Sequence, residues 1–121
     1  MLVHLFYKTV VNGLMRIGEY EEIILLLVGI LGENAYAFRL AEEYKTQKGR
    51  GTTIGTVHST LERLIEKGLL ESEIGAASAK RGGRRKRIYS LTAEGYQVLS
   101  DIKAVKTSLW NQFPGFSLDK S

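Results

Sequence analysis

The feature that most constrains the fold is an apolar segment of helix length, EYEEIILLLVGIL, from Glu19 to Leu31. Beyond its acidic first turn, a helix of this sequence is apolar on nearly every side, yet it is far shorter than the roughly 20 residues that span a membrane. It must therefore be buried by protein all round. A chain of 121 residues forms one small domain, near the lower end of the sizes that bury a self-sufficient core. We expect the domain to cover one face of this helix and a second subunit to cover the other.

The composition excludes several kinds of site. The chain has no cysteine, which removes disulfides, thiolate metal ligands and cysteine nucleophiles and is compatible with a cytoplasmic location. His4 and His58 are the only histidines, and no pair of carboxylates that share a pocket is recognisable in the sequence. We therefore expect no metal and no cofactor, and we predict that the protein is not an enzyme.

Basic residues are concentrated in one segment of the chain. The formal net charge is +4, but six of the 17 basic residues fall between positions 80 and 87, and without them 11 basic residues remain against 13 acidic ones. These six are Lys80, Arg81, Arg84, Arg85, Lys86 and Arg87. Such a segment indicates a localised contact with a polyanion. The alternative is an exposed loop that its charges merely keep soluble.

A helix expected from Thr53 to Gly68 has two different faces. Apolar residues gather on one side, namely Ile54, Val57, Leu61, Leu64 and Ile65. The other side is small, polar and free of acid over its N-terminal half, and its candidate DNA-contacting residues are Thr52, Thr53, Gly55, Thr56, Ser59 and Arg63. A helix that enters the major groove by its N-terminal end has this profile, because short side chains allow close approach and the helix dipole faces phosphate. The alternative is a surface helix with a threonine-rich start. His58, at the edge of the apolar side, is expected to be packed or half-buried rather than to contact bases.

The elements beside this helix complete a helix-turn-helix followed by a hairpin. We expect a preceding helix from about Ala35 to Gln47 with Asn34 as its N-cap, and then a glycine-rich break over residues 48–52. Apolar residues after Gly68 predict a strand over 69–74, and the sequence RIYSL predicts a second strand over 87–91. The basic segment therefore lies at the flexible tip and the second arm of a two-stranded hairpin.

The last predicted helix begins after Thr92 and is stopped by Pro114. Its apolar residues recur at steps of four and three, which is the pattern of a helix that pairs with another helix. Together with two positions of the first apolar helix, they form the candidate dimer interface of Ile23, Leu27, Val98, Ile102, Val105 and Leu109. The alternative is a seam that packs only within its own subunit.

The two chain ends carry weaker signals. Residues 1–14 form an apolar arm or extension that suits either a helix or a strand, and they lack the basic start and cleavage site of a signal peptide. Because this arm is also too short to cross a bilayer, we expect no membrane contact. Residues 114–121 are expected to be a disordered tail.

Three segments of the chain carry a recognisable pattern, namely GEYEEIILLLVGILGENAY, TIGTVHSTLERLIEKGLLES and RGGRRKRIYSLTAEG, which together cover most of residues 18–95. They resemble the PadR family of bacterial transcriptional regulators. The third is the most specific, because a glycine pair before a basic strand and a Leu-Thr-x-x-Gly motif recur in that family's wing. Two positions depart from the family pattern, since His58 stands where tyrosine is usual and Ala37-Phe38 stands where Gly-Tyr is usual.

The resemblance implies a mainly α fold with a small β-hairpin. A winged helix-turn-helix domain would occupy residues 15–91, and a dimerisation helix would occupy 92–113. It further implies a homodimer in which the first and last helices pair, so that two recognition helices and two wings face adjacent grooves of a double-stranded DNA operator. The predicted function is sequence-specific transcriptional regulation, as a repressor. The alternative is a winged-helix module that binds an acidic protein or RNA.

The resemblance also implies a place for an effector. Some members of the family bind planar aromatic compounds between their paired C-terminal helices. Trp110, the only tryptophan, and Phe113 lie near the end of the last helix and are the candidate contacts for a small aromatic effector. The alternative is that both rings simply pack in the dimer interface.

Overall fold

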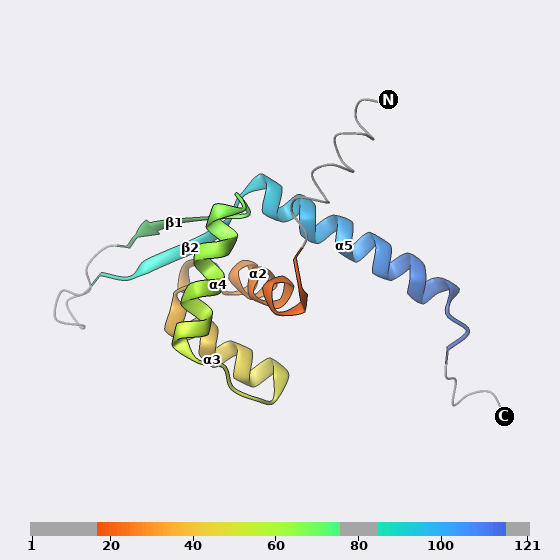
Figure 1. Ribbon diagram of the computed structural model, residues 1–121, viewed down its shortest axis with the longest axis horizontal. Coiled ribbons are helices and arrows are strands. Elements are labelled where there is room, and N and C mark those ends of the chain that lie inside the picture. Colours follow the sequence, from red (N-terminus) through yellow and green to blue (C-terminus); the bar gives the residue numbers. More distant parts are fainter. Residues whose placement is uncertain (1–16, 76–84, 116–121) are drawn as a thin grey trace.

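The computed structural model describes residues 17–75 and 85–115 (Figure 1). Its elements are α2 (Glu19–Leu31), the 3-10 turn η1 (Gly32–Asn34), α3 (Ala37–Lys48), α4 (Ile54–Glu66), β1 (Leu70–Ile74), β2 (Arg87–Leu91) and α5 (Ala93–Gln112). The predicted fold, mainly α with a small β-hairpin, is confirmed. The expectations for the N-terminal arm, for most of the hairpin tip and for the end of the tail lie outside the described residues.

Helix α2 is the centre of the molecule, as its apolar sequence requires. Figure 1 shows α2 between α3, α4 and the hairpin, with α5 extending away from this body. Ile24 and Leu25 are fully buried, and Leu27 and Val28 are 2% exposed. They pack in one cluster with residues of the surrounding elements, among them Leu40, Tyr44, Val57, Leu61, Leu64, Leu70 and Tyr89. Burial of α2 therefore accounts for the arrangement of the other elements around it.

Helix α3 begins later than the sequence indicated. Asn34 belongs to the turn η1, and the N-cap of α3 is Tyr36, which makes no capping bond through its side chain. The prediction of Asn34 as the cap is therefore wrong. The physical reason is a tertiary contact, because the Tyr89 N–H donates to the carbonyl of buried Ala35 over 2.9 Å and holds this residue beside β2 rather than in a helix.

The two strands form an antiparallel hairpin, as predicted. Leu70 pairs with Leu91, and Ile74 pairs with Arg87 at the far end of the described ladder. Gly68 has a φ of 76°, a left-handed conformation that a glycine adopts without strain and that turns the chain from α4 into β1. The hairpin therefore follows directly after α4, the helix that the sequence predicts as the recognition helix.

The start of α5 is tightly joined to the turn before β1. The Thr92 hydroxyl accepts the Gly95 N–H over 3.0 Å and donates to the Gly68 carbonyl over 2.6 Å. Gly95 is buried, and a Cβ at this position would overlap the Leu69 carbonyl oxygen. Further along α5, Lys106 Nζ lies 2.9 Å from Glu22 Oε1 of α2. These contacts set the angle at which α5 leaves the body of the domain.

The described helices include none that is both long and apolar enough to span a bilayer. Within residues 17–75 and 85–115, no three His, Cys, Asp or Glu side chains lie together as a metal site.

Candidate nucleic-acid interface

The start of α4 is fixed by a short series of hydroxyl groups. The Thr53 hydroxyl accepts the Thr56 N–H over 3.0 Å and donates to the Thr56 hydroxyl over 2.8 Å. The preceding Thr52 hydroxyl lies 2.7 Å from the phenol oxygen of Tyr20, on α2. Thr53 is therefore the N-cap of α4, at the position where the sequence placed the start of this helix, and the residue before it is tied to the central helix.

The inner face of α4 anchors it in the core. Val57, Thr60, Leu61 and Leu64 have no exposed surface. Ile54 does not belong to this face, since its side chain is 40% exposed. The predicted apolar side is thus shorter than expected, because the helix starts at the rim of the core and its first residue projects beyond it.

The outer face of α4 is open where the sequence placed its small residues. Gly55, Thr56 and Ser59 are exposed, and the Ser59 hydroxyl donates to the Thr56 carbonyl over 3.2 Å. A Cβ at Gly55 would meet only the Thr53 hydroxyl, at 3.9 Å. No contact within the described chain requires a glycine at this position, so its lack of a side chain leaves room for an approaching partner.

Arg63 is held differently from the other candidate contact residues. Its side chain is 51% exposed, but Nε donates to Glu21 Oε2 over 3.3 Å and Nη2 donates to the Thr60 hydroxyl over 3.2 Å. Lys67 Nζ lies 3.1 Å from Glu21 Oε1. Burial on its own raises the pKa of Glu21, but hydrogen bonds from Lys67, Gly18 and Arg63 and the Lys67 charge outweigh it, so the net pKa is lowered. Glu21 therefore stays charged at neutral pH and binds both cations.

The described part of the basic segment forms the base of the wing. Arg85 and Arg87 are exposed, and Arg87 donates to the Ser72 hydroxyl of β1 over 2.9 Å. Lys86 Nζ lies 3.4 Å from the centroid of the Tyr36 ring, a cation–π contact that joins the wing to the start of α3. Lys80, Arg81 and Arg84 lie outside the described residues.

A cavity of about 560 Å³ lies between the wing base, the start of α3 and α4. Its lining consists of Tyr36, Ala37, Phe38, His58, Arg85, Lys86, Arg87 and Tyr89. His58 is exposed here, so the expectation of a packed or half-buried histidine is wrong. The reason is that His58 lies on the flank of α4 that faces the wing, where the structure leaves a cavity instead of core. Burial raises the pKa of Tyr89, with a smaller effect from Glu62, so its phenol stays neutral.

This cavity also brings together residues that the sequence pattern did not connect. His58 and the Ala37-Phe38 pair, the two departures from the PadR pattern, line the same surface. Phe38 is 59% exposed although it lies in an amphipathic helix. Tyr36 was missed as a site residue, and Phe38 was noted only as a departure from the family pattern, because the sequence of this segment gives no indication that the wing lies opposite it.

The candidate dimer residues divide into two groups. Leu27 and Val98 are buried within this chain, at 2% and 8% exposure, and Ile23 and Ile102 are partly buried. Val105 and Leu109 on α5 are each 60% exposed. On α2, the exposed apolar residues are instead Leu26, at 45%, and Ile30, at 67%. Leu26 and Ile30 are four residues apart, as on one face of a helix. The sequence could not single them out, because nearly every position of this helix is apolar.

The candidate effector residues lie at the far end of α5. Trp110 is 70% exposed and Phe113 is 56% exposed. Their rings meet edge to face, with centroids 5.6 Å apart and an interplanar angle of 89°. The two aromatic groups therefore form one exposed apolar patch on the chain.

A helix-turn-helix followed by a two-stranded hairpin defines the winged-helix class of proteins. Comparison with solved structures shows which winged-helix proteins this chain is similar to. The chain is similar to a PadR-like transcription factor from Bacteroides fragilis, with 28% identity over 84% of this chain and 93% of that chain and a TM-score of 0.65. It is also similar to a PadR family transcription regulator from Clostridium difficile, with 28% identity over 77% of this chain and 98% of that chain and a TM-score of 0.55.

A PadR-like transcriptional regulator from Bacillus cereus shares the fold at 21% identity, over 80% of this chain and 93% of that chain, with a TM-score of 0.60. No protein-family model matches the chain, and no curated protein matches it. The fold is that of the PadR-like transcriptional regulators, and the resemblance inferred from the sequence is confirmed.

Proposed function

We propose that this protein is a homodimeric transcriptional repressor that binds a double-stranded DNA operator. The observation that carries the proposal is the surface around the cavity, where the exposed, acid-free half of α4 lies on one side and the cations of the wing base lie on the other. A duplex on this surface would meet small polar groups from α4 and positive charge from the wing at the same time.

The two sides of this surface have different roles in the proposal. Gly55, Thr56 and Ser59 can approach base edges closely, and Thr53 begins the helix whose dipole faces phosphate. Arg85 and its basic neighbours in the wing contact phosphates, which supply affinity without regard to sequence. His58 and Phe38 lie between the two sides and become additional contact residues.

In the proposed homodimer, a second subunit covers the exposed apolar residues of α2 and α5. Val105, Leu109 and Trp110 on α5 and Leu26 and Ile30 on α2 are the large apolar groups that a second subunit would cover. Such a dimer presents two copies of α4 and two wings to one operator. A planar aromatic effector that inserts between the paired α5 helices would contact Trp110 and Phe113 of both copies and would act by favouring one dimer geometry over another.

Selection of preferred duplexes from a random pool tests the function and the target together. For the selected duplex, Arg85→Ala is expected to flatten the salt dependence of binding by roughly 1.8 per dimer, because each lost phosphate contact removes about 0.9 from the slope. Lys103→Ala, on the exposed surface of α5, is the matched control and is expected to leave the slope unchanged. Enrichment of no duplex, together with binding to RNA or to an acidic protein, would contradict the proposal.

The oligomeric state is tested separately by light scattering. Val105→Glu places a charge among the exposed apolar residues of α5 and is expected to give a monomer with weakened operator binding, because the two half-sites are then no longer held together. Thr107→Glu adds the same charge two residues away, about 200° around the helix, and is expected to remain a dimer. A soluble Val105→Glu dimer would place the interface elsewhere.

A further inference from the structure

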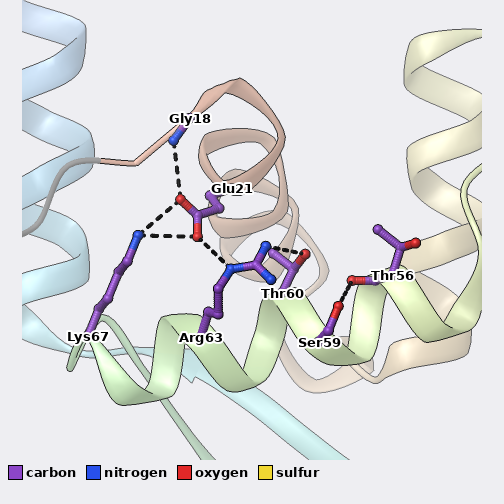
Figure 2. A network of polar contacts seen from close by, with 7 residues as sticks. All are labelled: Gly18, Glu21, Thr56, Ser59, Thr60, Arg63 and Lys67. Atoms are coloured by element: carbon purple, nitrogen blue, oxygen red, sulfur yellow. Dashed lines mark hydrogen bonds and ion pairs between the residues drawn. The ribbon is translucent and has the colours of Figure 1, made fainter.

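Among the described residues, Glu21 is the only acidic residue that is buried. It is 8% exposed. Its carboxylate bonds to two cations at the C-terminal end of α4 and to the backbone at the start of α2. Figure 2 shows its carboxylate between Arg63 and Lys67, with the Gly18 N–H donating to Oε1 from the third side over 3.2 Å. Lys67 Nζ bonds both carboxylate oxygens, at 3.1 and 3.2 Å. One carboxylate thus holds two cations that are 42 and 46 residues away in the sequence.

This arrangement divides α4 into two electrostatic halves. From Thr53 to Ser59 there is no acid, and the helix dipole makes this end positive. The second half carries the exposed acids Glu62 and Glu66, and its two cations are held by Glu21. Together with Glu21 it has three acids and two bases, which leaves it net negative, and the negative end of the helix dipole adds to this.

We propose that Glu21 is a specificity-determining residue, which withholds Arg63 and Lys67 from DNA so that α4 docks by its N-terminal half alone. This inference rests on the proposed DNA binding. It assigns Arg63 a role through Glu21 instead of a direct contact with the duplex. It also explains why a buried acid on the central helix points at the recognition helix rather than at solvent (Figure 2).

Glu21 can raise specificity because base contacts fix the position of α4 on a preferred duplex but not on random DNA. On a preferred duplex, base contacts and the wing define one docking geometry, so a freed Arg63 gains little. On random DNA no base contact defines the geometry, and α4 can settle wherever an extra cation reaches a phosphate. By holding Arg63 away from phosphates, Glu21 weakens the complexes with random DNA more than the complex with a preferred duplex, and the ratio of the two affinities rises.

The test is Glu21→Gln, compared with Glu22→Gln. Both substitutions remove one negative charge from α2 and keep the side-chain size, but Glu22 pairs with Lys106 of α5, not with α4. For a random duplex at about 0.1 M salt, Glu21→Gln is expected to raise affinity roughly tenfold and to steepen the salt slope by roughly 1.8 per dimer, as for one new phosphate contact per subunit. Affinity for the preferred duplex is expected to change less, so the ratio between the two falls. Glu22→Gln is expected to leave that ratio unchanged.

A second pair of variants separates this mechanism from a loosened fold. In a background with Arg63→Gln and Lys67→Gln, the effect of Glu21→Gln on random duplex should disappear, because no cations remain to be released. Thermal unfolding confirms that each variant is folded at the assay temperature.

Each outcome decides between the inference and its alternatives. If Glu21→Gln weakens binding to preferred duplex without steepening the slope on random duplex, Glu21 only supports the fold and the inference is wrong. The inference also fails if Glu22→Gln has the same effect, because general charge then explains the result. If the unmodified protein binds no duplex, the proposed function fails, and the inference fails with it.

Discussion

The starts of α4 and α5 use the same capping device in opposite surroundings. Each is capped by a threonine hydroxyl that accepts a backbone N–H three residues later over 3.0 Å, Thr53 from Thr56 and Thr92 from Gly95. Each also has a glycine in its first turn. Gly95 is buried against the Leu69 carbonyl, whereas Gly55 is exposed. The same capping device therefore accompanies a packed surface in one helix and an open surface in the other, and the surroundings decide which.

The largest effect is expected from Gly95→Ala, which tests the packed side of this comparison. The added methyl would overlap the Leu69 carbonyl oxygen, and this oxygen cannot move freely because it also accepts the Thr92 N–H over 3.1 Å. We expect the free energy of unfolding to fall by about 3 kcal/mol, the upper range for overpacking. Urea denaturation measures it. A loss no larger than that of an exposed helix substitution would mean that the junction adjusts easily.

Gly55→Ala is the matched change on the open side. Because a Cβ there has room, and alanine is the better helix former, the free energy of unfolding is expected to rise by up to about 1 kcal/mol. Binding to a preferred duplex is nevertheless expected to weaken, about tenfold, since the methyl stands where a base edge would approach. Titration of labelled duplex measures the affinity. A more stable variant with undiminished affinity would remove Gly55 from the interface.

The smallest expected effect is a difference in the free energy of unfolding between substitutions at the two caps. Thr53→Ala is expected to lower the free energy of unfolding by about 1 kcal/mol, the ordinary value of an N-cap. Thr92→Ala is expected to lower it by about 1 kcal/mol more, because the Thr92 hydroxyl also donates to the Gly68 carbonyl and so joins two elements. Parallel urea titrations give the difference. Equal losses would show that the bond to Gly68 contributes nothing to stability.

Local signals predicted the elements well. The start of α4 near Thr53, the Thr92 cap, the hairpin and the end of α5 before Pro114 all agree with the structure, because each depends on residues a few positions apart. The start of α3 was misplaced for the opposite reason. A bond from Tyr89 to Ala35, between residues far apart in the chain, holds Ala35 outside the helix.

The candidate site was predicted in part. The sequence indicated the exposed residues of α4 and the basic wing, because small polar residues and clustered charge are visible along the chain. It did not indicate that Tyr36 and Phe38 face the wing, or that His58 is exposed beside them. Whether these residues contact DNA remains a prediction of the proposed function.

The amino-acid sequence by itself determined that α2 is buried, where α5 is capped and that positive charge gathers in one segment, since periodicity, capping and charge are local properties. Only the tertiary structure decided which side of α2 stays open, at Leu26 and Ile30, because a helix that is apolar all round does not distinguish its faces. It also decided that Arg63 and Lys67 bind Glu21. That choice depends on the packing of α4 across α2, which brings together charges that the chain places more than 40 residues apart.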